Sequence, residues 1–430
     1  MNFDLLHPAD QIVLIMRRLY SFGMTTTSGG NLSIKDSDGV IWISPGSIDK
    51  GTLEREDIIK VLPGGEVIGI HKPSVELPIH KMVYERRPGT RAVLHAHPPS
   101  LVAFSAIREV PATDMIANIK VTCGEIRVGG YALPGSEELG VRIADQFALG
   151  ADVVIMDNHG AIVAAEDLFQ AFSIFETLDY CARIQINASA LGEIRRLTED
   201  ELTLYSTRYF PDMEEYSVGE YSSDERYYRQ AMCGYIHRAY NQQLFTATQG
   251  TFSRRLPDGS FFITPYGKDR MYLEPGDLVN IRDGRREAGK TPSRAVMLHK
   301  GVYDAHPDIQ AVAIAHPPNI MAFAVTGREF DAKLIPESYI MLKQVQRVPY
   351  GANLVRHNNQ AVEKISIKTP VCIIENDCVV VAGTGLLNVF DRLEVLEYSA
   401  KSVVAAGQLK KTVHAMPEEK IKEIEVAFNL

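Results

Sequence analysis

The feature that most constrains this chain is an internal repeat with an offset of 219 or 220 residues. The segment Lys72–Lys81 returns as Thr291–Lys300 with its Pro-Ser and His-Lys pairs, and the His97-Pro-Pro motif returns at His316. Solenoid proteins repeat every 20–50 residues or so, so an offset this long indicates two copies of one whole domain. We therefore predict a first copy at residues 1–215 and a second copy at residues 216–430.

Each copy alternates helical and strand-like stretches. Amphipathic helices are expected near residues 8–22 and 223–241, and long apolar helices near residues 166–190 and 385–407. Short β-type runs lie between them, at residues 40–44, 91–97, 153–156, 261–264, 311–315 and 371–374. A polar, Tyr-rich stretch at residues 198–221 joins the copies. This mixture predicts a layered α/β domain, although the strand order cannot be derived from it.

Composition narrows the function classes. The formal net charge is −9, and no basic run or aromatic-interleaved Lys/Arg stripe is present, which argues against nucleic acid and anionic membrane as partners. No stretch approaches the roughly 18 apolar residues of a membrane span, and the N-terminus lacks the pattern of a signal peptide. The five cysteines show no Cys-x-x-Cys motif and are expected to be reduced thiols. A cytoplasmic location is expected.

A pair of histidines is the first candidate for chemistry. Val93 to His97 reads as a short buried strand that two prolines end, and the period of two places His95 and His97 on the same face. Two imidazoles held in this way can share one divalent cation. A lone His-x-His is weak evidence, because many strand histidines are simply hydrogen-bonded.

Three turns ahead of the histidines offer groups that suit an anion. Ser28 and Asn31 flank a Gly-Gly turn, Gly46 follows a strand, and Ser74 opens a helix. Converging backbone N–H groups and helix N-termini favour phosphate or carboxylate. Each turn also has a purely structural interpretation: the Gly-Gly turn as a helix C-cap, and Ser74 as an N-cap.

Two further residues complete the candidate set. Glu76 lies in the first turn of the helix that follows Ser74, where an acid also stabilises the helix dipole. His159 follows the apolar strand at residues 153–156 and precedes Gly160. It could serve as a third ligand delivered to a pocket, or could only occupy a turn.

The ordered set of these motifs resembles the class II aldolase/adducin family, whose best-known enzymes are L-fuculose-phosphate and L-rhamnulose-phosphate aldolases. The resemblance covers about residues 8–195 closely and residues 223–408 in weaker form. The motifs that carry it are Ser28-x-Gly30-Asn31-x-Ser33, Ser44-Pro45-Gly46, Pro73-Ser74-x-Glu76-x-x-x-His80, His95-x-His97-Pro98 and Asn158-His159-Gly160.

The resemblance implies a three-layer α/β/α sandwich around a mostly antiparallel sheet, here duplicated in tandem. It implies that His95, His97 and His159 bind zinc and that Glu76 is the catalytic acid/base. Substrate phosphate would be held by the residues that match the family's phosphate site, namely Ser28, Asn31, Gly46 and Ser74. Val75 stands where the aldolases commonly have a second Ser, and the family's catalytic Tyr has no clear counterpart at residues 111–116.

The chemistry of these residues agrees with that reading. Three neutral imidazoles on Zn²⁺ leave coordination positions open, which is typical of catalytic sites. The metal would act as a Lewis acid for an enediolate, and Glu76 would shuttle its proton, a contribution of about 10²–10⁴-fold. We expect a zinc-dependent aldolase, an aldehyde-lyase of carbohydrate metabolism, acting on a short ketose phosphate or related hydroxy-keto compound. Mn²⁺, Co²⁺ and Fe²⁺ are not excluded.

The second copy lacks this set. At the repeat offset, Glu76 becomes Ala295, His95 becomes Ile314, His159 becomes Asp377, and only His97 has a counterpart, in His316. We interpret the second copy as non-catalytic. The resemblance implies the tetramer that is usual in the family, so we expect a homo-oligomer in which two chains, with two copies each, reproduce that arrangement of four domains. Residues that the second copy could lend across a boundary are Arg294, Tyr339 and Tyr350.

Two alternatives to aldol cleavage remain. The same metal chemistry could serve pentulose-phosphate 4-epimerisation, dehydration or decarboxylation, although the family's epimerases carry Asp where this chain has Glu76. A non-catalytic scaffold, as in the adducin branch, would lack the metal set. The second copy fits that description, and the first does not.

Overall fold

The computed structural model describes residues 3–207, 211–352, 360–411 and 413–430. The chain forms two compact units. The first unit comprises residues 2–113 and 119–183, and the second comprises residues 114–118 and 184–430. Residues 184–215, which the sequence interpretation placed in the first copy, therefore belong to the second unit. The boundary between domains at residues 215 and 216 stays a prediction.

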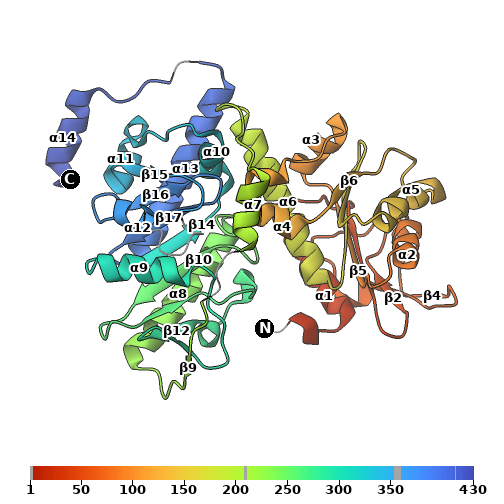
Figure 1. Cartoon of the computed structure of the whole chain (residues 1–430). Helices are drawn as coiled ribbons and strands as arrows, with labels where there is room; N and C mark the ends of the chain where they lie inside the picture. The colour runs from red at the N-terminus through yellow and green to blue at the C-terminus, as the bar shows by residue number, and fades with distance from the viewer. Residues whose placement is uncertain (1–2, 208–210, 353–359, 412) are drawn as a thin grey trace. The chain divides into compact units, whose positions relative to one another are not determined.

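The first unit is built on an eight-stranded sheet with the order β4-β3-β2-β1-β5-β8-β7-β6 (Figure 1). All neighbours are antiparallel except β6 and β7. The strands are β1 (Asn31–Lys35), β2 (Ile41–Ile43), β3 (Ile59–Val61), β4 (Val67–Ile68), β5 (Ala92–Ala96), β6 (Ile126–Val128), β7 (Val153–Met156) and β8 (Gly160–Ala165). Every residue of β5, β7 and β8 is buried, because helices cover both faces of the sheet.

Helices lie on both faces of this sheet. They are α1 (Pro8–Ser21), α2 (Leu77–Arg86), α3 (Pro99–Ile107), α4 (Ala117–Cys123), α5 (Glu137–Ala148) and α6 (Leu168–Ala188). The first two residues of α4 and residues 184–188 of α6 belong to the second unit. The neighbours α2 and α5 form a core with the sheet on one face, while α1 and α3 pack on the strands from the other (Figure 1). Helix α5 begins where the Ser136 hydroxyl accepts a hydrogen bond from the Leu139 N–H, and it buries Leu139, Ile143 and Phe147 along one face.

The second unit repeats this topology. Its nine-stranded sheet has the order β15-β16-β17-β14-β10-β11-β12-β13-β9. The strands are β9 (Glu215–Tyr216), β10 (Thr251–Arg255), β11 (Phe261–Ile263), β12 (Val279–Arg282), β13 (Arg285–Glu287), β14 (Ala311–Ala315), β15 (Val345–Val348), β16 (Val371–Ile374) and β17 (Cys378–Gly383). Strands β10 to β17 follow the order of β1 to β8, and the register also agrees: Asn31 pairs with His95, and Thr251 pairs with Ile314.

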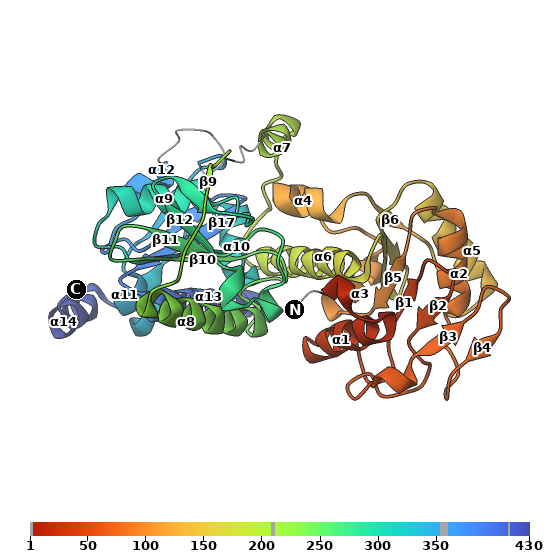
Figure 2. The same cartoon turned by 90° about the horizontal axis from the view of Figure 1, so that it is seen from below.

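The helices of the second unit also form two layers. They are α7 (Glu199–Ser206), α8 (Ser223–Asn241), α9 (Val296–Ala305), α10 (Pro318–Thr326), α11 (Pro336–Leu342), α12 (Gln360–Lys364), α13 (Leu386–Gln408) and α14 (Glu418–Phe428). Figure 2 shows α9 and α12 on one side of the strands and α8 and α13 on the other. Side chains of α9 and α12, including Val302 and Val362, join the sheet in a buried core.

The predicted fold class is confirmed: each copy is a three-layer α/β/α sandwich around a mostly antiparallel sheet. The four long helices were placed to within a few residues. The joining stretch at residues 198–221 holds helix α7 and strand β9, and its residues 208–210 lie outside the described part. None of the described helices is both long and apolar enough to span a membrane.

Both units bury the same trio, in which a Ser hydroxyl lies between a His ring and a Tyr hydroxyl. The trios are Ser33, His80 and Tyr84 in the first unit and Ser253, His299 and Tyr303 in the second. The hydroxyl of Ser253 lies 2.6 Å from both His299 Nδ1 and the Tyr303 hydroxyl. The trio therefore belongs to the shared fold.

The stability of the second unit should depend on pH through His299. Burial lowers the pKa of His299 to about 3, whereas the pKa of an unfolded His is about 6.5. Between these values the unfolded chain binds more protons, so the free energy of unfolding falls as the pH falls. We expect urea unfolding of a His299→Gln variant to lose stability less steeply below about pH 6.5, by up to about 1.4 kcal/mol per pH unit. Parallel pH profiles would contradict this.

Candidate metal centre and active site

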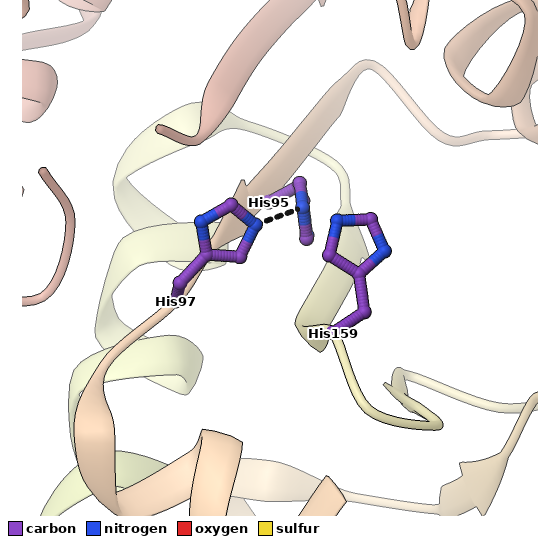
Figure 3. A group of neighbouring side chains, drawn as sticks. All are labelled: His95, His97 and His159. Atoms are coloured by element: carbon purple, nitrogen blue, oxygen red, sulfur yellow. Dashed lines mark hydrogen bonds between the residues drawn. The ribbon is translucent and has the colours of Figure 1, made fainter. Parts of the chain in front are cut away.

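His95 and His97 lie at the end of one buried strand. His95 is the fourth residue of β5, and His97 follows its last residue, so both rings leave the same face of the sheet. Their Nε2 atoms are 2.8 Å apart (Figure 3). The side-chain period of two, stopped by Pro98, gives this arrangement.

His159 joins this pair from the turn between β7 and β8. Asn158, with φ 54°, reverses the chain and brings the His159 ring beside the other two (Figure 3). Ligand atoms of His95, His97 and His159 all lie within 4.8 Å of one another. Among the described residues, no other group of three or more His, Cys, Asp or Glu side chains lies close enough to hold a metal.

Gly160 makes the close approach of His159 to the pair possible. A Cβ at this position would lie 2.6 Å from the Ala96 carbonyl oxygen and 2.8 Å from His97 Cδ2. Real Cβ atoms essentially never approach other heavy atoms this closely, so either the strand or the His97 ring would have to move.

We expect a Gly160→Ala variant to fold but to bind metal about 10–100-fold more weakly, the usual effect of disturbing the groups that orient a ligand. Titration with a competing chelator measures the affinity. Gly64→Ala is the matched control, because a Cβ there has nothing within 4 Å. Equal affinities in the two variants would mean that Gly160 does not set the ligand geometry.

The environment keeps His95 and His97 neutral. Burial, with a smaller contribution from neighbouring imidazoles, lowers the pKa of His95 and of His97 to about 3. Nδ1 of His95 lies 2.9 Å from the Ala161 carbonyl oxygen, which can only accept a hydrogen bond. In the neutral ring the Nδ1 therefore carries the proton, and Nε2 presents a lone pair to the cluster, which is the form that binds metals.

Glu76 lies against the histidine cluster. It occupies the N-cap position of α2 and is only 5% exposed. Its Oε2 lies 3.4 Å from His95 Nε2, and its Oε1 lies 3.4 Å from His159 Nε2. Oε1 is buried and accepts no hydrogen bond from the described residues. One carboxylate oxygen is therefore available for a substrate or a cation.

A buried chain of hydrogen bonds leads to the other oxygen of Glu76. Asn31 Nδ2 donates to Glu76 Oε2 over 2.6 Å. This places Asn31 Oδ1, an acceptor, 2.5 Å from His80 Nε2, so the His80 ring must donate there. His80 Nδ1 then accepts from the Ser33 hydroxyl at 2.6 Å, and Ser33 contacts Tyr84 at 2.7 Å. The chain holds Glu76 in one position relative to the histidines.

The four residues predicted to hold phosphate differ in their exposure and in the hydrogen bonds that they already make. Ser28 is exposed, and a Cβ on its neighbour Gly29 would lie 3.0 Å from His97 Nδ1, so the turn lies beside the cluster. The Gly46 N–H already donates to the Lys72 carbonyl oxygen. The Ser74 hydroxyl accepts from the Glu76 N–H at 3.3 Å, as a cap would. A role in binding phosphate stays a prediction for Ser28, Asn31, Gly46 and Ser74.

The sequence interpretation gave no role to two residues near the site. His80 was only part of a motif, although its position one helical turn after Glu76 places both on the same face of α2. Lys50 is buried, its Nζ donates to the Pro45 carbonyl oxygen, and burial lowers its pKa to about 8. Lys50 is thus a cation beside the turn of Gly46.

The three histidines and Glu76 fit a divalent metal. The lone pair on His95 Nε2 faces the other two rings at separations of 2.8 to 4.8 Å. Tetrahedral zinc with bonds of about 2.0–2.1 Å to nitrogen would separate its ligand atoms by roughly 3.3 Å. The unsatisfied Glu76 Oε1 also faces this group. The donor atoms of this site are imidazole nitrogens and a carboxylate oxygen, and a bound cation would interact favourably with all of them.

In the second unit the residues equivalent to Glu76 and the three histidines also lie together, but they do not form a set of metal ligands. Ala295, Ile314, His316 and Asp377 line one pocket. The three residues proposed as lent groups contact their own unit: Arg294 bonds to Tyr205, Tyr339 to Glu425 and Tyr350 to Glu201. A role for these three across a subunit boundary stays a prediction.

Comparison with known proteins agrees with the repeat and identifies the family. The sequence model described as "Class II Aldolase and Adducin N-terminal domain" matches residues 10–186 and again residues 230–404. The chain belongs to this family. The two matched segments cover most of the sequence, which confirms the resemblance and the tandem duplication inferred from the offset.

Individual class II aldolase relatives match one copy at a time. A 5-deoxy-D-ribulose 1-phosphate aldolase from Bacillus thuringiensis is 31% identical over 196 residues, which are 45% of this chain and 91% of the relative. A 3-oxo-tetronate 4-phosphate decarboxylase from Pectobacterium atrosepticum is 30% identical over 45% of this chain and 89% of its own length. A solved L-fuculose 1-phosphate aldolase is 31% identical, with a TM-score of 0.42, over 46% of this chain and 93% of that one.

Proposed function

We propose that this protein is a zinc-dependent class II aldolase that cleaves or forms a carbon–carbon bond in a short ketose phosphate or a related hydroxy-keto compound. The observation that carries the proposal is the position of Glu76, whose two carboxylate oxygens lie 3.4 Å from His95 and from His159. A site that only stored a metal would not need a buried carboxylate with one unsatisfied oxygen.

The first copy's own residues would divide the work. His95, His97 and His159 would hold the metal, which when bound supplies a Lewis acid for the negative charge that develops beside the substrate carbonyl. When the bond between the carbon next to the carbonyl and the hydroxyl-bearing carbon breaks, its electron pair stays on the former, and the latter becomes the aldehyde carbon as its hydroxyl proton is lost to water. Glu76 would return a proton to the carbon next to the carbonyl, and in the reverse direction would remove it. Asn31 and His80 would keep the Glu76 carboxylate in place.

Zinc is proposed because all three protein ligands would be imidazole nitrogens. Nitrogen donors suit Zn²⁺, whereas Mg²⁺ and Ca²⁺ prefer oxygen. Three protein ligands leave a position open for substrate, as in other catalytic zinc sites.

Decarboxylation is a second candidate, which the decarboxylase relative favours. Both reactions break a carbon–carbon bond next to a carbonyl and leave an electron pair that must be protonated. They differ in the leaving group, which is an aldehyde in one case and carbon dioxide in the other. The metal ligands and Glu76 would serve either reaction.

Product analysis separates the two candidates. The zinc-loaded protein is incubated with ketose 1-phosphates and, separately, with phosphorylated 3-oxo acids. Aldehyde is followed by reduction with NADH and a dehydrogenase, and carbon dioxide by a coupled carboxylase. Aldehyde without carbon dioxide is the expected result. Carbon dioxide alone would support the decarboxylase, and no turnover of either set would contradict both.

We further propose that the chain assembles as a homo-oligomer, most simply a dimer in which two active and two inactive copies alternate. The support is that the second copy has lost three of four site residues yet keeps strand order, register and buried trio. Light scattering measures the mass. A monomer that turns over at full rate would contradict this.

A further inference from the structure

The second copy keeps a pocket at the place of its lost metal site. The cavity measures about 80 Å³ and lies entirely within the second unit. One water needs only about 10–15 Å³ on the same measure, so the cavity can hold a small molecule. Ala295 and Ile314 replace the base and one ligand, so the pocket has neither the carboxylate of Glu76 nor the imidazole of His95.

Asp377 gives this pocket an unsatisfied acceptor. It lies in the turn between β16 and β17, where Asn376 has φ 53° and repeats the turn of Asn158. The Asp377 side chain is 6% exposed and lines the pocket, and its Oδ2 accepts no hydrogen bond from the described residues. Leaving a buried carboxylate oxygen without a donor is costly, so this atom indicates a ligand that carries a hydroxyl or an amine.

Arg294 gives the same pocket a cation, whose guanidinium lies 5.2 Å from the ring centre of Tyr205 and 5.6 Å from that of Tyr266. It occupies the position of Val75 and is therefore absent from the first copy. Its Nη2 donates to Asn118 Oδ1 at 3.1 Å and to the Tyr205 hydroxyl at 2.6 Å, and both partners belong to the second unit. No described carboxylate lies within ion-pair distance of it, and its Nε and Nη1 donate no hydrogen bond to the described residues. Held at one edge, the guanidinium can receive an anion at the other.

Two buried hydroxyls also line the pocket, as do His316 and the buried Arg270. Thr251 Oγ1 and Ser293 Oγ lie 2.9 Å apart and are both buried at the pocket. Thr251 stands where the first copy has Asn31, and Ser293 where it has Ser74. The pocket thus combines a cation, a carboxylate and small hydroxyl groups from three segments: Ser293 and Arg294 before α9, Thr251 in β10, and Asp377 between β16 and β17.

We propose that this pocket binds a small anionic hydroxy compound without converting it. The carboxylate or phosphate of the ligand would face Arg294, and one of its hydroxyls would donate to Asp377. Binding without turnover follows from the chemistry, since Ala295 cannot move a proton. The second copy is then a separate small-molecule site of the chain, and this inference stands independently of the reaction proposed for the first copy.

The test is isothermal titration of the full-length chain carrying His97→Ala, which removes one proposed metal ligand from the first copy. The probes are glycolate and glycerol phosphate. Acetate and ethyl phosphate are matched compounds without the hydroxyl, and glycine replaces it with an amine. We expect saturable binding of a hydroxy probe at one site per chain, and binding at least about tenfold weaker for the matched compound, or about 1.4 kcal/mol.

Variants connect the signal to the pocket. Arg294→Gln and Asp377→Asn should each weaken binding by about tenfold or more, and Arg294→Lys should retain part of it because the charge remains. Thermal unfolding identifies a variant that has not folded, in which case the other substitution decides. Absence of saturable binding up to about 10 mM, weaker than the mM affinities of simple ligands, would overturn the proposal. Equal affinity in the variants, or preference for glycine, would also overturn it.

Discussion

Replacing His97 with Ala should remove the metal from this protein and lower turnover by at least about 10³-fold. The proposed metal would supply several kcal/mol of transition-state stabilisation, and each 1.4 kcal/mol or so corresponds to a factor of ten in rate. His97 Nε2 lies 2.8 Å from His95 Nε2, so its loss opens the ligand set on one side. Elemental analysis of the purified chain, with turnover measured on the same samples, gives both quantities.

The duplication supplies the matched control for this experiment. His316 stands at the position of His97 in the second unit, beside Ile314 and Asp377 instead of two further imidazoles. We expect about one metal per chain in the wild type, the same in His316→Ala, and none in His97→Ala. Two metals per chain, or loss of metal in His316→Ala, would show that the second copy also binds metal. No metal in the zinc-treated wild type would favour a scaffold.

The sequence predicted the cluster of three histidines because the position of each follows from a local rule. His95 and His97 share a face because side chains on a strand alternate. His159 follows the end of a strand and precedes Gly160, which allows a close approach to His97. The repeat was equally visible, since a constant offset needs no knowledge of the fold. These rules depend only on residues that are close together in the sequence, so they can be applied without knowledge of the tertiary structure.

What the sequence did not predict depends on register between distant segments. Asn31 was assigned to phosphate from its Gly-Asn turn, yet Nδ2 donates to Glu76 and Oδ1 accepts from His80. These contacts exist because β1 pairs with β5 and places Asn31 opposite His95. Strand pairing across more than sixty residues cannot be read from periodicity.

Helix α7 was missed for a different reason. Thr198 and Glu201 form a reciprocal capping box, a signal visible in the sequence as Thr-x-x-Glu. The stretch was interpreted as a joining segment because it is polar and rich in Tyr, and composition was given more weight than the cap. The helix is short and buries only Tyr205, so its sequence does not show a clear helical period of apolar residues.

The buried hydrogen bonds that connect Tyr84 to Glu76 should affect the rate of turnover but not the metal content of the protein. Asn31→Ala removes the donor to Glu76 Oε2, and His80→Gln disturbs the group that fixes Asn31. We expect each variant to retain about one metal per chain while kcat falls about 10–100-fold, the range found when groups that orient active-site residues are lost. KM should change little in His80→Gln, because His80 is not proposed to contact the substrate. A rise in KM in Asn31→Ala would support the predicted role of Asn31 in holding the substrate phosphate.

The second copy provides a control that distinguishes a role of His80 in catalysis from a role in stability alone. His299 has the same Ser and Tyr partners as His80, but Thr251 replaces Asn31, and His299 Nε2 has no hydrogen-bond partner among the described residues. His299→Gln should therefore disturb an equivalent buried trio and leave kcat unchanged, whereas His80→Gln lowers it. Equal losses of kcat in the two variants would show that both histidines only stabilise the fold. A loss of metal in Asn31→Ala would place Asn31 among the groups that support the metal ligands instead of the base.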